Sequence, residues 1–268
     1  MIVNQIKLIH PLNTNMVKIL VIDTETTGLF HASGVNNKKI EYAIKNKNVE
    51  KTLENFNDNW LNECPHITQM CFIIYDTNTE SVTHIYNKFI DIDINVKVHK
   101  IASKITHIYT TPQDVIDNGE NPSDNQIIIL SELKKNSPNK IEPVEIMIES
   151  FIHALEICEC IIGHNVIFDI QVLLVEVKRI NNMIYFKKIF EINHECTMLQ
   201  STNICNLMIG KRKKYPKLIE AYNILFKDEI LYSELHNAFI DAYVCLKIYC
   251  KLNNWIQPPH YFNLIQTC

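Results

Sequence analysis

The chain has 268 residues, 47% of them hydrophobic, and a formal net charge of −4. This length allows one substantial hydrophobic core, and the apolar content excludes a chain that is disordered throughout. The negative balance excludes nucleic-acid binding by overall charge. Such a role would need a local basic patch or a bound metal ion to offset the phosphates.

The pattern of cysteines and the shortness of the apolar runs predict where in the cell the protein is found. The nine cysteines are scattered without a Cys-x-x-Cys pair, and no signal peptide is recognisable; both features predict free thiols in a reducing environment. No apolar run approaches the roughly 18–20 residues that a membrane span requires. We therefore expect a soluble intracellular protein, cytoplasmic or nuclear, without a membrane partner. The abundance of Ile, Asn and Lys is typical of an AT-rich genome, such as that of a large DNA virus or a protist.

The first part of the chain is dominated by predicted strands. Residues 1–15 have no firm period and are interpreted as an N-terminal extension. Residues 16–22 form a nearly continuous β-branched run, which is typical of a central strand buried on both faces, and polar residues appear abruptly after it. Two further strands are expected at residues 67–75 and 82–90, joined by a polar turn.

The second part alternates a strand with helices and then becomes wholly helical. The expected elements are a helix over residues 142–155, a strand over 158–162, a helix over 166–180, a strand over 190–196, and helices over 197–208, 217–226 and 238–252. Early strands, late helices and strand–helix alternation between them predict an α/β layer fold.

Two segments interrupt this pattern and are interpreted as insertions. Residues 30–65 are rich in Asn, Lys and Glu and are expected to be partly helical and solvated, and residues 118–143 are rich in Asn, Ser, Pro and Lys. The predicted organisation is therefore one domain over residues 16–252, which contains both insertions, followed by a C-terminal tail over residues 253–268.

The first group of candidate functional residues is Asp23-Thr24-Glu25, at the end of the first predicted strand. Residues two apart on a strand point to the same face, so the two carboxylates would project into one pocket. Paired acids repel each other unless a cation lies between them, and Mg²⁺ binds carboxylate and phosphate oxygens. Taken alone, the same residues would more often form an N-cap or an Asx turn at a strand end.

The second and third groups follow later in the chain. Asp169 falls in the first turns of a helix that follows Gly163, where a carboxylate would also favour the helix dipole. In the segment from His236 to Asp241, positions five apart on one helix lie about 140° apart, so the two side chains converge only if His236 precedes the helix. Asn237 is a good N-cap residue, which favours that arrangement.

The spacing His-Asn-x-x-x-Asp occurs twice, at His164 and at His236. Either histidine would suit a proton acceptor beside a fixed metal ligand, because its pKa lies near neutrality. The spacing does not decide between them, and each histidine could also have a purely structural role.

In order along the chain, the segments Asp23-Thr-Glu-Thr-Thr-Gly-Leu29, His164-Asn-x-x-Phe-Asp169 and His236-Asn-Ala-x-x-Asp241 resemble the three motifs of the DEDDh exonuclease family. This family includes the proofreading ε subunit of bacterial DNA polymerase III, RNase T and the TREX enzymes. The resemblance extends over about residues 17–252. It implies a ribonuclease H-like α/β fold, with a mixed sheet of about five strands flanked by helices.

The resemblance also implies a set of roles. Asp23, Glu25, Asp169 and Asp241 would hold two Mg²⁺ or Mn²⁺ ions, and His236 would be the general base. Two such ions can activate a water molecule and stabilise the leaving oxygen during phosphodiester hydrolysis. The products would be nucleoside 5′-monophosphates, removed one at a time from the 3′ end of DNA or RNA.

The implied partner is a nucleic acid with a free 3′ end, expected to be single-stranded, with a polymerase or a second copy of the chain as further candidates. Thr26, Thr27 and Gly28 would approach the terminal nucleotide, and Leu29 would wedge between the last bases unless it simply packs in the core. His164 and Asn165 would lie near the scissile phosphate. The basic run at residues 211–214 would suit phosphate binding, a solvated loop or a nuclear-import signal equally.

Two other functions compete with the exonuclease. A catalytically inactive relative would grip nucleic-acid ends without cutting them, and its usual sign would be the loss of a motif residue; all five are present. A thiol enzyme built on Cys158 or Cys196 would need a reactive cysteine, whereas cysteines in apolar strands are usually inert.

Overall fold

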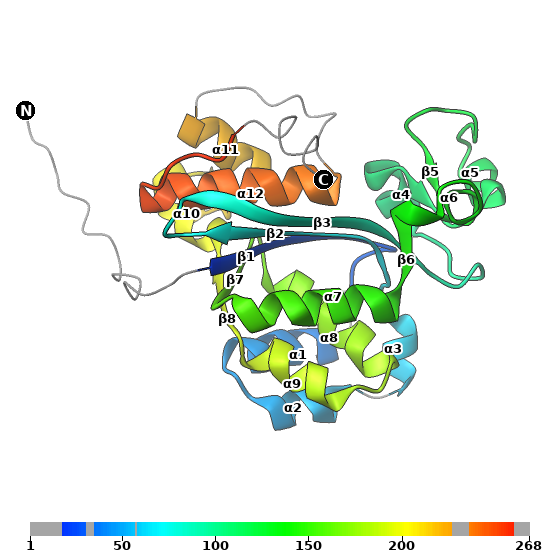
Figure 1. Ribbon diagram of the computed structural model, residues 1–268, viewed down its shortest axis with the longest axis horizontal. Helices are drawn as coiled ribbons and strands as arrows, with labels where there is room; N and C mark the ends of the chain where they lie inside the picture. Colours follow the sequence, from blue (N-terminus) through cyan, green and yellow to red (C-terminus); the bar gives the residue numbers. More distant parts are fainter. Residues whose placement is uncertain (1–17, 31–34, 57, 227–235, 260–268) are drawn as a thin grey trace, which may run out of the picture.

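The computed structural model describes residues 18–30, 35–56, 58–226 and 236–259. The predicted N-terminal extension and residues 260–268 of the predicted tail lie outside these ranges. In the described part, a mixed β-sheet lies between two layers of helices (Figure 1). This is the α/β layer arrangement that the order of predicted elements indicated.

The main sheet has six strands in the order β6-β3-β2-β1-β7-β8. Their bounds are β1 Lys18–Thr26, β2 Ile67–Asp76, β3 Ser81–Asp91, β6 Ile141–Pro143, β7 Cys160–Gly163 and β8 Asn193–Cys196. The pairs β1–β2 and β2–β3 are antiparallel, whereas β1–β7, β7–β8 and β3–β6 are parallel. Five strands were expected, and the sixth is β6, a three-residue addition from the segment interpreted as the second insertion.

The prediction that the first strand stops at Asp23 is wrong. β1 continues to Thr26, and Asp23, Thr24 and Glu25 each pair with a residue of β2. Main-chain ladder bonds do not depend on side-chain polarity, so the change from apolar to polar side chains does not end the strand. The candidate carboxylates therefore stand on a rigid central strand, not on a turn.

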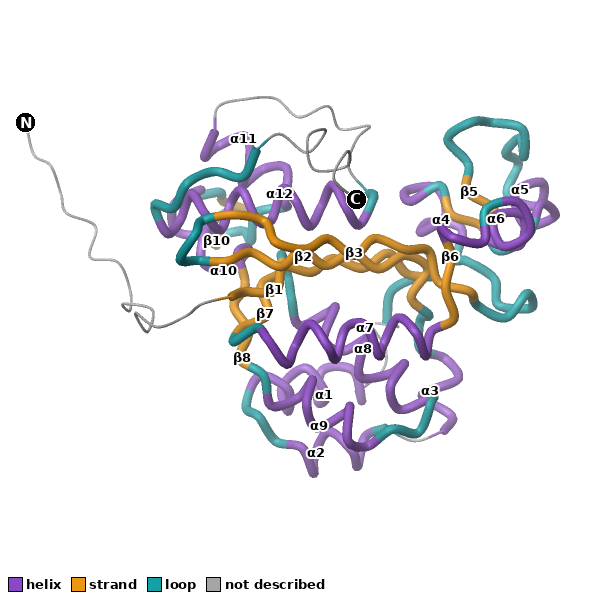
Figure 2. Tube along the Cα trace, in the orientation of Figure 1, coloured by secondary structure: helices purple, strands orange, loops and turns teal. Residues whose placement is uncertain are grey.

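Helices cover both faces of the sheet (Figure 2). α7 (Val144–Ile157) and α8 (Ile167–Arg179) pack on one face, and α12 (Ala238–Asn253) packs on the other. Near α12 lie two further helices, α10 (Thr197–Cys205) and α11 (Leu218–Phe226). All five correspond to helices predicted from the sequence, within a few residues at the ends.

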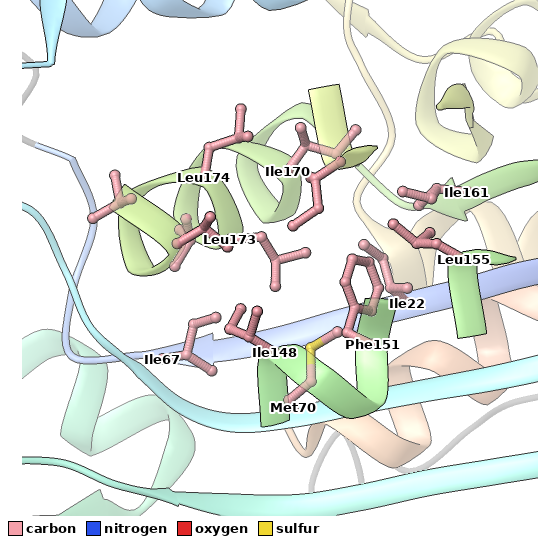
Figure 3. Packing of buried hydrophobic residues seen from close by; sticks show 14 of the residues in the cluster. Ile22, Ile67, Met70, Ile148, Phe151, Leu155, Ile161, Ile170, Leu173 and Leu174 are labelled. Atoms are coloured by element: carbon pink, nitrogen blue, oxygen red, sulfur yellow. The ribbon is translucent and has the colours of Figure 1, made fainter. Parts of the chain in front are cut away.

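Alternate side chains of β1 enter two separate cores, as its unbroken apolar run predicted. Leu20 and Ile22 join the core beneath α7 and α8, and Ile19 and Val21 join the core beneath α12. Figure 3 shows Ile22 with side chains of α7 and α8 in the first core. Burial on both faces keeps β1 rigid, and this rigidity fixes the position of the carboxylates that it carries.

The segment over residues 30–65 is helical as expected, but it is not simply solvated. It forms α1 (Val35–Lys45), α2 (Val49–Asn55) and α3 (Asp58–Glu63). Ile40, Ile44 and Phe56 are buried in the same core as α8. The polar residues dominate the composition of this segment, but its apolar residues recur on one face and become buried.

A buried charged network ties this helical segment to α8. Glu176 is 3% exposed, and its Oε1 accepts hydrogen bonds from the Ile67 backbone N–H at 3.1 Å and from Arg179 Nη1 at 3.0 Å. Arg179 also donates to the backbone oxygens of Leu61 and Cys64. The network satisfies buried groups at the junction between α3, β2 and α8.

Replacing Glu176 with Ala is expected to lower the free energy of unfolding by about 3 kcal/mol, because it leaves the Arg179 guanidinium and a backbone N–H without their carboxylate. Urea unfolding of the variant measures this change. Glu149→Ala, on the exposed side of α7, is the control and should change stability by less than about 0.5 kcal/mol. Equal effects of the two changes would contradict a structural role for the network.

The remaining elements were not predicted individually. α9 (Met183–Glu191) is a short helix whose Phe186, Ile189 and Phe190 are buried, so the strand expected from residue 190 begins only at Asn193. Beyond β3, the chain forms small elements that surround two satellite apolar clusters. These are α4 Lys100–Thr106, β4 Ile108–Tyr109, α5 Pro112–Asp117, β5 Ile128–Ile129, α6 Leu130–Asn136 and the 3₁₀ turn Pro138–Lys140.

None of the helices in the described ranges has the length and apolar character needed to cross a bilayer.

Candidate metal centre

The candidate site begins where β1 loses one of its neighbours. β7 pairs with β1 only over Ile19, Leu20 and Val21, whereas β2 follows β1 to its end. Asp23 and Glu25 lie beyond the last β7 pair, on the same face of the strand as Val21. They therefore point toward α12, at the part of β1 that β7 no longer borders.

Three predicted ligands meet at this position. Asp23, Glu25 and Asp241 each offer an oxygen, and these atoms all lie within 4.8 Å of one another. Asp241 stands in the first turn of α12, which begins after the N-cap Asn237; the Asn237 side chain accepts a hydrogen bond from Phe239 N at 3.1 Å. The helix start predicted from Asn237 is confirmed, and it brings Asp241 to the end of β1.

The fourth predicted ligand, Asp169, lies next to this group but is held separately. It stands in the first turn of α8, is 5% exposed, and its Oδ1 accepts a 2.8 Å hydrogen bond from Thr24 Oγ1. Its charge acts on both Asp23 and Glu25, which places it within electrostatic reach of the group. Four carboxylates from β1, α8 and α12 thus converge, although they are separated by up to 218 residues (241 − 23).

The crowding of these acids opposes their ionisation. Burial, followed by the charges of Asp241, Asp169 and Glu25, raises the pKa of Asp23 well above its ordinary value. Burial, followed by the charges of Asp241 and Asp169, raises the pKa of Glu25 to about 8. Burial raises the pKa of Asp169 and that of Asp241 to about 7, despite hydrogen bonds that favour their charged forms. Without a cation, the four acids cannot all be charged at neutral pH at low cost.

A divalent metal ion fits this arrangement. The side-chain oxygen Oδ1 of Asp241 is buried and has no hydrogen-bond partner among the described residues. Hard cations such as Mg²⁺ and Mn²⁺ prefer carboxylate oxygens as ligands. A cation would remove the mutual repulsion and satisfy this oxygen, so the donor set matches the predicted metal centre.

His236 precedes α12, as the sequence required for it to converge with Asp241. Its backbone has a φ of 69°, and its N–H donates to Asp241 Oδ2 at 3.3 Å. Burial, followed by the positive charges of Lys217 and His107, lowers the pKa of its imidazole. A lowered pKa keeps the ring neutral near pH 7, the form that can accept a proton.

The other candidate base, His164, is engaged on both ring nitrogens. Nδ1 lies 2.9 Å from Thr197 Oγ1 and Nε2 lies 3.0 Å from the Pro216 carbonyl oxygen. The carbonyl can only accept, so Nε2 carries the proton and Nδ1 accepts from the hydroxyl. Burial lowers the pKa of His164 to about 4. In this arrangement no nitrogen of His164 is left for a phosphate, and the ring ties the start of α8 to α10 and to the segment before α11.

The segment after β1 is anchored by its neighbours. Thr27 N donates to His66 O at 2.8 Å, and His99 N donates to Thr27 O at 2.7 Å. The Thr26 hydroxyl donates to the Gly28 carbonyl oxygen at 2.6 Å. These bonds hold a short loop whose backbone lies next to the acidic group, where substrate contacts at Thr26, Thr27 and Gly28 remain a prediction.

Leu29 and Asn165 both face solvent near this loop and the start of α8. Leu29 is 78% exposed, so the alternative that it packs in the core is wrong. Asn165 is exposed and has a φ of 72°, a left-handed conformation that asparagine tolerates better than most residues. An exposed leucine beside an acidic group suits the expected wedge between the last bases, which remains a prediction.

Two residues that position the site were not predicted from the sequence. Gln69 is 2% exposed; its Oε1 accepts from Ala238 N at 3.3 Å, and its Nε2 donates to Asn87 at 2.9 Å. It thereby fixes the start of α12 opposite Glu25, its partner in the ladder. The available signal was a glutamine inside a mostly apolar strand. The second is His99, which approaches Gly28 so closely that a Cβ there would lie 3.3 Å from the His99 Cβ; the sequence carries no comparable signal for it.

The thiol alternative has little support in the described structure. Cys158 is buried, and burial raises the pKa of its thiol to about 12, so almost no thiolate forms near neutral pH. Cys196 is half-buried and stands at the N-cap position of α10.

Thr24 is expected to position Asp169 through its hydroxyl. Thr24→Val keeps the shape and removes the 2.8 Å hydrogen bond, so it should reduce metal affinity or metal-dependent activity by about tenfold to a hundredfold. Thr24→Ser retains a hydroxyl and should restore most of the loss. If the valine and serine variants behaved alike in a Mn²⁺ titration, the hydrogen bond would have no positioning role.

Comparisons with known proteins define the class of fold. No protein-family model matches the chain, and no curated protein sequence matches it. Solved structures do match: E. coli Exonuclease I with zinc and single-stranded DNA (TM-score 0.53, 16% identity) and E. coli Exonuclease I with a dT13 oligonucleotide (TM-score 0.53, 15% identity). An Exonuclease I structure without ligand gives a TM-score of 0.52 at 14% identity.

Each of these matches covers 94% of this chain but only 43–45% of the Exonuclease I chain. The chain thus spans less than half the length of these proteins. At such identity the likeness establishes the fold, and the ribonuclease H-like α/β fold expected from the three motifs is confirmed.

Proposed function

We propose that this protein is a metal-dependent 3′→5′ exonuclease of the DEDDh type. The observation that carries the proposal is the meeting of Asp23, Glu25 and Asp241 within 4.8 Å, with Asp169 alongside. Structural ion pairs would combine opposite charges, whereas this group contains only acids with raised pKa values. Such an arrangement is costly for the fold and is typical of a functional site.

The four acids would hold two Mg²⁺ ions, for which Mn²⁺ could substitute. When bound, the ions would supply activation of water and stabilisation of the charge that develops on the leaving oxygen. The protein's own contribution is the rigid placement of its acids on β1, α8 and α12. His236 would accept the proton of the attacking water, since its neutral ring precedes α12 beside Asp241.

The substrate would be a single nucleic-acid strand with a free 3′ end, and each cycle would release a nucleoside 5′-monophosphate. Two of the structural neighbours are described as complexes of Exonuclease I with single-stranded DNA or an oligonucleotide, which favours single-stranded DNA over RNA as the first substrate to test. Exposed Leu29 would contact the terminal bases, with Thr26, Thr27 and Gly28 beneath it. We further propose an intracellular setting, in the cytoplasm or nucleus, where a polymerase or a second copy could be a partner.

The test is a cleavage assay with single-stranded oligonucleotides labelled at the 5′ end or the 3′ end. With Mg²⁺ or Mn²⁺, the 3′ label should leave first as a mononucleotide while the 5′-labelled strand shortens stepwise, and EDTA should stop both. An RNA strand of the same sequence measures the preference for DNA. Tight, metal-dependent binding of a 3′ end without any cleavage would instead identify an inactive end-binding protein and would contradict the proposal.

A further inference from the structure

The basic run before α11 forms a defined hairpin. β9 (Met208–Ile209) pairs with β10 (Arg212–Lys213), and the connection is the two residues Gly210 and Lys211. Gly210 has a φ of 59°, a left-handed conformation that glycine adopts without strain. A further bond from Lys214 N to Leu207 O at 2.9 Å extends the pairing. The segment is therefore neither an unstructured loop nor a helix.

The cations of this run divide into two groups. Lys213 donates to Asn203 Oδ1 at 2.6 Å, and Lys214 pairs with Glu220. Within the described ranges, Lys211 and Arg212 have no acidic partner, and both are exposed at the tip of the hairpin. The first pair anchors the hairpin to α10 and α11, which leaves the second pair available to an anion.

Exposed aromatic and aliphatic side chains accompany these free cations. Ile209 is 66% exposed and Met208 is 52% exposed on β9, and Tyr215, just after the hairpin, is 60% exposed. In the hairpin ladder Arg212 lies opposite Ile209 and Lys213 lies opposite Met208, so cations and apolar side chains lie side by side, as in single-strand sites that combine phosphate contacts with base stacking.

The hairpin is connected directly to the acidic centre. Tyr215 is followed by Pro216, whose carbonyl oxygen accepts the 3.0 Å hydrogen bond from His164 at the start of the segment that carries Asp169. The next residue, Lys217, is close enough to His236 for its charge to affect that ring. One continuous stretch of chain thus leads from the hairpin to His164 and His236, the first residues of the second and third motifs.

We propose that the β9–β10 hairpin, with Tyr215, is a binding site for the part of a single-stranded nucleic acid that lies upstream of the 3′ end being cut. Lys211 and Arg212 contact backbone phosphates, and the Tyr215 ring stacks on a base. The site explains how a chain with a net charge of −4 binds a polyanion. This inference rests on the proposed exonuclease function and specifies how that site selects strands longer than a few nucleotides.

The experiment compares an oligothymidylate of about twenty nucleotides with a dinucleotide too short to reach the hairpin. The variants are the double change Lys211→Ala/Arg212→Ala, and Tyr215→Ala with Tyr215→Phe as its aromatic counterpart. The control is Lys38→Ala/Lys39→Ala, which removes the same charge from an exposed part of α1. KM and kcat are measured for both substrates over a range of salt concentrations.

In the double variant, KM for the long strand should rise about tenfold or more, and the salt dependence of binding should weaken by about two charges. The ratio of kcat/KM between the long strand and the dinucleotide should fall with it, and Tyr215→Phe should retain what Tyr215→Ala loses. The inference is overturned if KM for the long strand is the same in the double variant as in the wild type. It is also overturned if the α1 control raises this KM by the same factor.

The inference can fail separately from the proposed function. If the wild type cleaves neither substrate, binding of the long strand to the wild type and to the double variant, measured by fluorescence anisotropy, still tests the hairpin. Tenfold weaker binding by the double variant supports it, and unchanged binding overturns it. If the hairpin changes abolish binding to anionic lipid vesicles while oligonucleotide binding stays at the wild-type level, the partner is a membrane surface and the inference is wrong.

Discussion

Asp23→Asn is expected to reduce the rate of metal-dependent cleavage at least about a hundredfold, because it removes one charged ligand from the centre of the acidic group. Asp23 is the group whose ionisation is opposed by all three of the other acids. Its neutral amide would keep the shape of the site but would bind a hard cation poorly. The cleavage rate of a 3′-labelled oligonucleotide at saturating Mg²⁺ measures the loss.

The same substitution is expected to make the metal-free protein more stable at pH 8, since it relieves the repulsion between Asp23 and its acidic neighbours. An inactive variant with a higher Tm cannot be explained as a misfolded protein. Glu149→Gln is the control: it removes an exposed acid of α7 and should change neither the rate nor the Tm appreciably. Retention of more than a tenth of the activity by Asp23→Asn would exclude the proposed ligand role.

The metal-free protein is expected to lose stability as the pH rises from 5 to 8. The folded-state pKa of Glu25 is raised to about 8, and those of Asp169 and Asp241 are raised to about 7, whereas unfolded carboxyls titrate near pH 4. The folded state therefore binds more protons than the unfolded state across this interval. The stabilisation that these bound protons give the folded state is fully present below about pH 4, and it is lost as the pH rises through 7 to 8.

The expected loss is at least about 2 kcal/mol between pH 5 and pH 8, since a shift of one pKa unit corresponds to about 1.4 kcal/mol. Mn²⁺ or Mg²⁺ should restore the stability at pH 8 and have much less effect at pH 5, where protons already neutralise the acids. Thermal melts with EDTA or with metal at the two pH values make the measurement. A metal-free protein that is equally stable at both pH values, and that no divalent ion stabilises, would contradict the candidate centre.

Much of the secondary structure could be predicted from local pattern. The strands β2 and β3 and the helices α7, α8, α11 and α12 agree with the predictions to within a few residues, because their apolar residues recur with a strand or helix period. α9 was not predicted, although Asn182 caps its start and its buried Phe186, Ile189 and Phe190 recur with helical spacing. The end of β1 was misplaced because main-chain pairing with β2 continues where the apolar side chains stop.

The identity of the acidic residues was also accessible from the sequence, because strand geometry brings Asp23 and Glu25 to one face and an N-cap places His236 ahead of Asp241. Their meeting was implied only by the resemblance to the three motifs and not by local spacing, because the packing of α8 and α12 at the end of β1 brings these distant residues together. The two histidines illustrate the difference. They share one spacing in the sequence, but the fold engages both nitrogens of His164 with Thr197 and Pro216.

The sequence by itself determined the residue types, the order of the motifs and the elements that carry them, since these depend on local spacing and on burial patterns along the chain. Only the tertiary structure decided that Asp169 is held by Thr24, that Leu29 faces solvent, and that the basic run is a hairpin connected through Pro216 to His164. These features depend on contacts between segments far apart in the chain, and local propensity does not encode such contacts.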